Sequence, residues 1–233
     1  MAASSLALAP APRPVHYPDS DGMPIAESTQ QFRWIVLLKE NIDALVADFV
    51  AGDLLWYPVE GDNKTRQAPD VLVALGRPKG DRGSYRQWEE GGVAPQVVFE
   101  VLSPGNRLGE MIRKFKFYER FGVEEYYIID PEASSFLGYW RQDGQLVDVN
   151  SDEDVVSPRL GVRFHHDEQG LQVLRPDGQP FRTFQELMSA AETEKQRAET
   201  EKQRAEAEKQ RADASEARLA ELEARLRALG LEP

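Results

Sequence analysis

Two carboxylates interrupt the most apolar segments of the chain. Asp70 follows Pro69 directly before the apolar run at residues 71–75, and Glu100 stands inside the run at residues 97–102. An ionised carboxylate on a buried strand is costly unless it is paired or bound to a cation, and two on neighbouring strands also repel each other. A divalent cation relieves both costs, and carboxylate oxygens suit Mg²⁺ or Mn²⁺. The pattern therefore predicts a site for Mg²⁺, with Mn²⁺ as an alternative, at Asp70 and Glu100.

Lys114 is the third candidate for this site. Its segment has apolar residues at helical spacing, and Glu110, Lys114 and Tyr118 recur at every fourth position along another side of the predicted helix. Lys114 can therefore point back toward the strand that carries Glu100. An ammonium group beside a metal-bound water orients that water and stabilises the charge that develops on a phosphate under attack.

Each of these residues also has an ordinary structural explanation. An aspartate after proline is common in turns, which would account for Asp70. Glu100 can face solvent at a strand end or pair with an arginine, and Lys114 can pair with Glu110 on the helix surface. The combination favours a site, because the strands that carry Asp70 and Glu100 are expected to be neighbours.

The surrounding pattern predicts the elements that position these side chains. Apolar residues at three- and four-residue steps predict a helix over residues 29–50. Strands are expected at 49–58, 68–75, 95–102, 125–130, 136–141, 145–149 and 160–164, with a glycine-rich loop at 76–92. A second helix runs to about residue 121, where Gly122 can cap it, and a short helix near 184–188 leads into the tail. This order predicts an α/β fold with a mixed sheet flanked by helices.

Composition narrows the functional classes. The chain has 233 residues, no cysteine and a formal net charge of −12. The missing cysteine excludes a disulfide scaffold, a thiol nucleophile and a zinc–thiolate site, and it fits the reducing cytoplasm, where we expect the protein. No apolar run is long enough to span a bilayer, so no membrane partner is expected. The acidity argues against broad electrostatic binding of nucleic acid.

The negative charge is unevenly distributed. Residues 189–233 contain 11 acidic and 9 basic residues, so residues 1–188 carry −10 of the net charge. Residues 77–120 instead hold nine basic and six acidic residues. We predict that Arg82, Arg86 and Lys116 of this segment contact DNA, although the loop that holds the two arginines can also be an ordinary surface loop.

The chain divides into a proline-containing head (1–27) that is expected to be flexible, a central domain (28–188) and a tail (189–233). The tail repeats ETEKQRA at 192 and 199 and EAEKQRA at 206, and its leucines at 219, 222, 226 and 229 have the spacing of a coiled-coil seam. Further upstream, alanine and glutamate occupy the seam positions. The weak seam favours a solvated helix with a short leucine zipper at its end, and a coiled coil through the whole tail is the alternative.

Three sequence strings together resemble the Uma2 family of predicted bacterial restriction endonucleases, within the PD-(D/E)XK nuclease superfamily. They are PD at 69–70, EVLSPGN at 100–106 and KFKFYERFGVEEYYIIDP at 114–131, and the resemblance covers roughly residues 28–165. It implies an αβββαβ nuclease core in which Asp70, Glu100 and the main-chain carbonyl of Val101 bind the metal.

The chain departs from the superfamily pattern in the position of its lysine. Leu102 stands where that lysine is expected, two residues after the acid, and Lys114 on the following helix matches the shifted lysine of this family. Glu110 stands where relatives usually have aspartate. Glu40, on the first helix, matches an acidic residue that is frequent in the superfamily. Glu40, Glu110 and Tyr118 are therefore expected to support the site.

Two functions remain open on this basis. The first is a Mg²⁺-dependent DNA endonuclease in which Asp70 and Glu100 hold the cation and Lys114 positions the attacking water. The second is a catalytically inactive, nuclease-like interaction protein that associates through its C-terminal helix. DNA is the expected partner in the first case, and self-association through the body or the tail is possible in both.

Overall fold

A six-stranded sheet forms the centre of the protein. The computed structural model describes residues 15–22, 25–149, 154–168 and 170–228, and it divides between residues 181 and 182 into two compact units. The sheet has the order β1-β3-β5-β6-β7-β8, and only the β5–β6 pair among these neighbours is parallel. Its strands are β1 (Asp48–Gly52), β3 (Val71–Pro78), β5 (Val97–Val101), β6 (Glu125–Asp130), β7 (Ser135–Gln142) and β8 (Gln145–Asp148).

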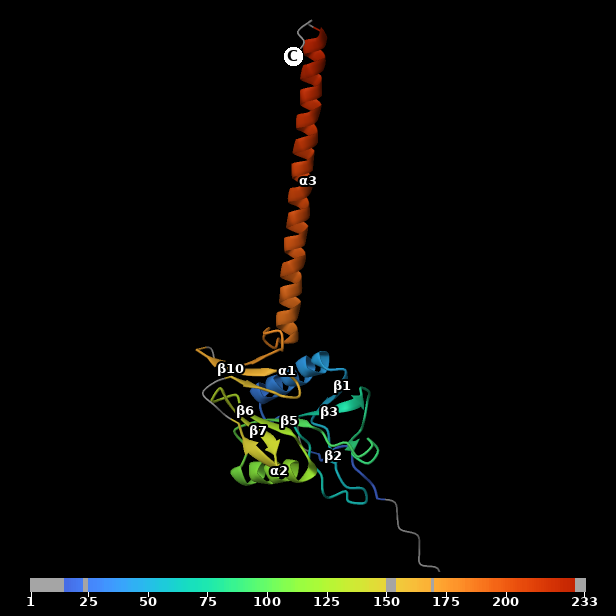
Figure 1. Cartoon of the computed structure of the whole chain (residues 1–233), viewed down its shortest axis with the longest axis vertical. Helices are drawn as coiled ribbons and strands as arrows, with labels where there is room; N and C mark the ends of the chain where they lie inside the picture. Colours follow the sequence, from blue (N-terminus) through green and yellow to red (C-terminus); the bar gives the residue numbers. More distant parts are fainter. Residues whose placement is uncertain (1–14, 23–24, 150–153, 169, 229–233) are drawn as a thin grey trace, which may run out of the picture. The chain divides into compact units, whose positions relative to one another are not determined.

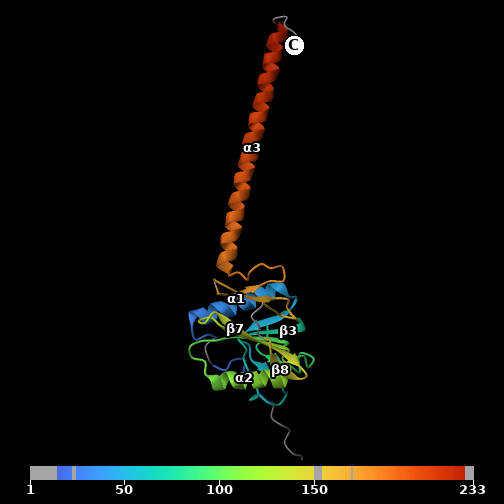
Figure 2. The same ribbon diagram turned by 60° about the vertical axis from the view of Figure 1, so that its left-hand side comes forward.

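Helices cover the two faces of this sheet. Helix α1 (Thr29–Leu45) lies on one face and α2 (Leu108–Phe121) on the other, as Figures 1 and 2 show from two directions. A small antiparallel sheet packs on the α1 side, where its apolar residues join the core of α1 and the central sheet. Its strands are β9 (Val155–Val156), β10 (Arg163–Asp167) and β11 (Gly170–Leu174). Because both faces are covered, all five residues of β5 are buried, the carboxylate of Glu100 included.

Helix α2 is the crossover that a parallel strand pair requires. The chain leaves β5, passes through α2 and returns as β6, parallel to β5. Gly122 ends the helix in the left-handed conformation, with φ of 94°, and its N–H bonds the carbonyl of Tyr118. Gly122 thus has the capping role predicted for it.

A two-stranded parallel pair of β2 (Trp56–Tyr57) and β4 (Tyr85–Arg86) packs beside α2. The Trp56 indole is fully buried, and its ring centroid lies 5.3 Å from that of Phe117 and 6.4 Å from that of Tyr118. This aromatic cluster fixes the face of α2 that points at the sheet.

With β2 and β4 set apart in their own small sheet, the order α1–β1–β3–β5–α2–β6 confirms the αβββαβ core that the resemblance implied. Several boundaries differ from those predicted. The first helix ends at Leu45 instead of residue 50, because residues 48–52 pair with β3. The strand predicted over 49–58 is broken by a turn at Asp53, whose φ is 47°. The loop predicted over 76–92 contains β4, and the strand predicted over 160–164 lies at 163–167 between β9 and β11.

The tail is one continuous helix, α3 (Phe184–Ala228), which includes the short helix predicted at 184–188. Leu229, the last of the four seam leucines, lies outside the described residues, as do residues 1–14 and 23–24 of the predicted flexible head. The described part of the head lies against the body, where the Tyr57 hydroxyl donates to the carbonyl of Pro18 at 2.6 Å. Among the described residues, no helix is both long and apolar enough to cross a membrane.

Replacing each of two glycines of the α2 segment with alanine should change the free energy of unfolding in opposite directions. Gly122→Ala should lower the free energy of unfolding by about 1 kcal/mol, because an L-residue is strained at positive φ. Gly109→Ala, in the first turn of the helix, should raise it by up to about 0.5 kcal/mol, because alanine loses less backbone entropy. Denaturant unfolding of both variants measures the difference, and a stabilising Gly122→Ala would contradict this account of the α2 terminus.

Candidate active site

Asp70 and Glu100 lie side by side on adjacent strands. In the antiparallel β3–β5 pair, Val71 is opposite Phe99, so Asp70 at the start of β3 comes next to Glu100. Asp70 is 8% exposed and Glu100 is 2% exposed. The Oδ2 atom of Asp70 accepts a hydrogen bond of 2.6 Å from the N–H of Val101. The structure thus brings together the two carboxylates that the sequence singled out.

Lys114 and Tyr118 both reach Glu100 from α2. Lys114 Nζ lies 2.8 Å from Oε2 of Glu100, and the Tyr118 hydroxyl donates to Oε1 of the same carboxylate. The two residues are one helical turn apart, so one face of α2 presents both donors. Lys114 therefore pairs with the strand carboxylate, as predicted, and the alternative surface pair with Glu110 is not the contact that forms.

Electrostatics in this cluster favour a proton on Asp70. Burial raises the pKa of Asp70 well above its ordinary value, and the neighbouring charge of Glu100 raises it further. The Val101 N–H and the Lys114 ammonium act in the opposite direction but do not outweigh burial. Two buried carboxylates facing one lysine leave an excess of negative charge.

Lys114 keeps its proton in the same surroundings. Burial, the largest single effect, would lower the pKa of Lys114, but the charge and hydrogen bond of Glu100 together with the charges of Asp70 and Glu110 outweigh burial. The pKa of Lys114 is therefore raised above its ordinary 10.5. The side chain acts as a fixed cation at neutral pH.

The Val101 carbonyl, predicted to be a metal ligand, accepts a hydrogen bond of 2.8 Å from Nε2 of Gln31. Gln31 lies in the first turn of α1, where its N–H donates to the Ser28 side chain that caps the helix. This buried bond ties α1 to the end of β5. A carbonyl oxygen has a second lone pair, so the bond does not exhaust what Val101 can accept.

Asp53 is a neighbour of the site that sequence reasoning missed. It lies in the turn after β1, and its N–H donates to the carbonyl of Asp70 at 3.2 Å. Burial raises the pKa of Asp53, with Asp21 and Glu100 adding to the effect and Lys114 opposing it. Asp53 interrupts the apolar residues of 49–51 and 54–57, but its approach to Asp70 depends on the turn at this position, so the folded arrangement is what places it at the site.

Tyr126 of β6 is a second residue that the sequence did not single out for its chemistry. Its hydroxyl is buried and has no hydrogen-bond partner within the part of the chain that the structure describes. Its ring centroid lies 5.0 Å from that of Tyr118, and Glu100 contributes to raising its pKa, after burial. A buried hydroxyl without a partner is costly and points to a missing acceptor at the site.

The supporting residues differ in their positions. Glu110 lies close enough to Lys114 to raise its pKa. Glu40 is exposed on α1 and pairs with Lys39 at 3.0 Å, a contact on the surface of its own helix. Its placement gives it no observed link to Asp70 or Glu100.

The three predicted DNA contacts also differ. Arg82 pairs with Glu90 at 2.6 Å and stacks on Phe49 with its guanidinium 3.8 Å from the ring centre, so only 15% of its side chain is exposed. Arg86 pairs with Glu89 at 3.3 Å. Lys116 is exposed on α2. Contact of Arg82 with DNA would require its present bonds to break.

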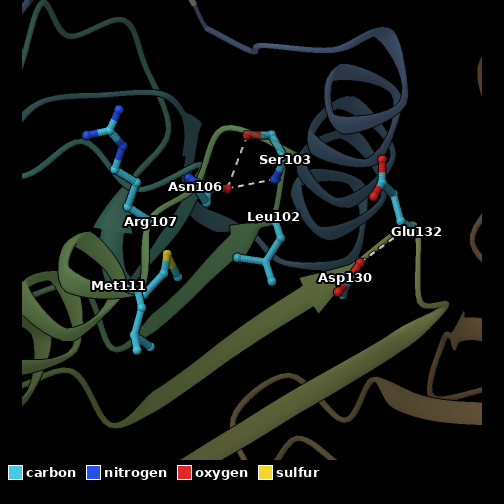
Figure 3. A pocket seen from close by; sticks show the side chains of 8 residues that line it. Leu102, Ser103, Asn106, Arg107, Met111, Asp130 and Glu132 are labelled. Carbon is cyan, nitrogen blue, oxygen red and sulfur yellow. Dashed lines mark hydrogen bonds between the residues drawn. The ribbon is translucent and has the colours of Figure 1, made fainter.

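A pocket of about 250 Å³ opens where β5 and β6 end and α2 begins (Figure 3). Leu102 and Met111 are apolar residues of its lining, and Arg107 and Asp130 are charged ones. The Asn106 side chain, which accepts from the Ser103 N–H at 2.6 Å, holds the loop between β5 and α2. Leu102 comes two residues after Glu100, but Asp70, Glu100 and Lys114 are not among the residues that line this pocket.

The donor atoms suit a small hard cation. Among the described residues there is no group of three or more histidine or carboxylate side chains arranged to hold a metal ion. Mg²⁺, however, is commonly bound by one or two carboxylates together with water and substrate phosphate. The excess charge of Asp70 and Glu100 and the unpartnered Tyr126 hydroxyl both fit such an ion and its water.

Removing the charge of Asp70 should stabilise the metal-free fold. Asp70→Asn keeps an oxygen for the Val101 N–H but cannot ionise. Because the pKa of Asp70 is raised by folding, the contribution of Asp70 to stability is fully present below its unfolded-state pKa and is lost as the pH rises through its folded-state pKa. In EDTA at about pH 8, the variant should exceed the wild type by about 1 kcal/mol or more, and the gap should close in acid.

Denaturant unfolding at both pH values measures this gap, and Asp62→Asn is the control. Asp62 is a partly exposed loop residue whose pKa is lowered by its hydrogen bonds with Thr65, so its replacement should bring no gain at high pH. A constant difference between Asp70→Asn and the wild type across the pH range would contradict the charge argument.

The two tyrosines that face this cluster form a second matched pair. Tyr118→Phe removes a donor from buried Glu100 and should lower the free energy of unfolding by about 1–3 kcal/mol. Tyr126→Phe removes a hydroxyl without a partner and should leave the stability unchanged or slightly raised. Equal losses in thermal or denaturant unfolding would show that the hydrogen bond to Glu100 is not what distinguishes them.

Comparison with known proteins identifies the family. A crystal structure described as "a putative nuclease belonging to DUF820", from Anabaena variabilis, is 16% identical over 57% of this chain and 75% of that chain, with a TM-score of 0.44. No curated protein matches the sequence. Residues 8–172, more than half of the chain, match the Uma2 family, which is described as "Putative restriction endonuclease". The chain therefore belongs to the Uma2 family.

Proposed function

We propose that the protein is a Mg²⁺-dependent DNA endonuclease whose active site is the cluster of Asp70, Glu100 and Lys114. The observation that carries this proposal is the meeting of two buried carboxylates with a lysine 2.8 Å from one of them. Membership of the Uma2 family supports a nuclease. Mn²⁺ has the same ligand preference and is expected to replace Mg²⁺.

Asp70 and Glu100 would hold the cation, with Val101 as a further main-chain donor. When bound, Mg²⁺ polarises a phosphate oxygen and lowers the pKa of a water molecule. Tyr118 fixes the orientation of the Glu100 carboxylate through its hydroxyl. The Gln31 side chain holds the Val101 carbonyl at the same end of β5.

Lys114 contributes a positive charge and hydrogen bonds. Since its pKa is raised, it remains protonated at neutral pH and is a poor general base. Its role is to orient the attacking water and to stabilise the charge that develops on the phosphate.

The position of the basic residues supports a DNA substrate. Lys116 is exposed on the helix that carries Lys114, and Arg107, which lines the pocket at the start of that helix, is exposed as well. Arg86 retains partial exposure beside the Tyr17 ring, 5.3 Å from its guanidinium. These cations would contact phosphates and offset the negative charge of the body, so binding should be weak and sensitive to salt.

The runner-up is an inactive nuclease-like protein that acts through interactions. It is favoured by Leu102 at the usual lysine position and by the existing ion pair, in which Lys114 already neutralises Glu100. The two proposals differ in one property, which is metal-dependent cleavage.

Cleavage of supercoiled plasmid tests the proposed activity. The wild type should nick or linearise DNA in Mg²⁺ or Mn²⁺ and not in EDTA. Asp70→Asn, Glu100→Gln and Lys114→Met should each reduce the rate about 100-fold or more, as expected for the loss of a metal ligand or a charge-stabilising group.

Matched controls are Asp62→Asn and Lys64→Met, which change the same residue types in a loop outside the site. Both should retain the wild-type rate. Absence of metal-dependent cleavage on supercoiled, linear and single-stranded DNA would overturn the nuclease proposal in favour of the interaction protein.

A further inference from the structure

The 45-residue helix α3 has no buried residue within its described length. It nevertheless exposes large apolar side chains near both ends. They are Phe184 (78% exposed), Leu187 (51%), Met188 (56%), Leu219 (58%), Leu222 (51%) and Leu226 (40%). Apolar side chains at regular helical spacing normally pack against a partner helix.

All of these residues except Met188, which lies at an e position, occupy the a and d positions of a single heptad phase. Steps of seven back from Leu219 reach alanines and then Phe184, which gives an apolar residue at every a position of the helix. Steps of seven back from Leu222 reach Ser215, three glutamates and then Leu187 at the d positions. The seam is continuous in phase. Glutamates occupy its d positions at 194, 201 and 208, and the longer of the two uncharged stretches runs from Ala212 to Leu226.

The flanking charges of that last part select a partner and an orientation. Arg211 and Arg218 occupy g positions, and Glu216 and Glu223 occupy e positions. In a parallel, in-register pair each g residue faces the e residue five positions later in the partner helix, so Arg211 meets Glu216 and Arg218 meets Glu223. In an antiparallel pair, g would face g and e would face e, which brings like charges together.

In the repeats upstream, the charges at the e and g positions would repel a second parallel helix. Their g positions hold Arg197 and Arg204, which would face Lys202 and Lys209 of a parallel partner. Within one helix, however, each of these arginines has a glutamate four residues further on, at Glu201 and Glu208. This segment is therefore stabilised within its own helix and repels a second copy, so it serves as a spacer.

We propose that two copies of this chain associate through residues 211–226 as a short, parallel, two-stranded coiled coil with a helical spacer before it. Ser215 at a d position favours two strands, because a two-stranded seam leaves its hydroxyl at the edge, in reach of water. The seam has few layers, so the dimer should be weak and form at micromolar concentrations or above.

A parallel pair attaches both nuclease units at the same end of the paired helices. If the proposed function holds, this gives each dimer two sites for the two strands of one duplex.

Cross-linking of single cysteines tests this arrangement directly, because the chain has no cysteine of its own. Ser215→Cys places a thiol at a d position, where a parallel, in-register dimer sets it against the same residue of the partner. Ala217→Cys places it at an f position on the outer side of the helix. The full-length Ser215→Cys variant should form a disulfide-linked dimer under mild oxidation, and Ala217→Cys should form about tenfold less.

Sedimentation at rising protein concentration provides the second readout. The wild type should show a reversible monomer–dimer equilibrium. Glu216→Lys with Glu223→Lys should raise the dissociation constant about tenfold or more, and an equimolar mixture with Arg211→Glu and Arg218→Glu should restore association. A wild type that stays monomeric, a trimer, or equal cross-linking of both cysteines would overturn the proposal. Neither readout depends on cleavage, so loss of nuclease activity would leave this test intact.

Discussion

The buried carboxyl pair of Asp70 and Glu100 is the constraint around which the central domain is organised. Neighbouring strands place these groups together, and burial makes their repulsion stronger than it would be in water. Lys114 and Tyr118 compensate Glu100, while the Val101 N–H partly compensates Asp70. The raised pKa of Asp70 shows that this compensation is incomplete. A fold selected for stability alone would place apolar residues here. The energetic cost of burying this carboxyl pair therefore points to a function.

The rest of the domain supplies rigid positions for those few contacts. The parallel β5–β6 pair requires α2 as its crossover, and α2 carries Lys114 and Tyr118 on one face. The Trp56 ring stacks parallel to that of Tyr118 and so fixes the rotation of the helix. On the other face of the sheet, Gln31 ties α1 to the end of β5. Both helices thus meet the same strand at the site.

Much of the fold and the central site could be predicted from local sequence patterns. The apolar runs with embedded acids located β3 and β5, and the four-residue spacing of Lys114 and Tyr118 located the face of α2. What depends on long-range pairing could not be predicted. The β2–β4 pair joins residues almost 30 positions apart, and Asp53 reaches the site only through a turn. The Arg82 guanidinium forms an ion pair with Glu90 and stacks on the Phe49 ring. None of these leaves a periodic signal in the chain.

The central claim is that Asp70 and Glu100 form a divalent cation site. A crystal of the protein soaked in Mn²⁺, with anomalous diffraction recorded at the manganese edge, tests that claim most directly. The account predicts an anomalous peak between the two carboxylates, with Lys114 moved away from its 2.8 Å contact with Glu100 Oε2. An empty cluster with that contact intact, under conditions in which Mn²⁺ is bound elsewhere or not at all, would contradict it.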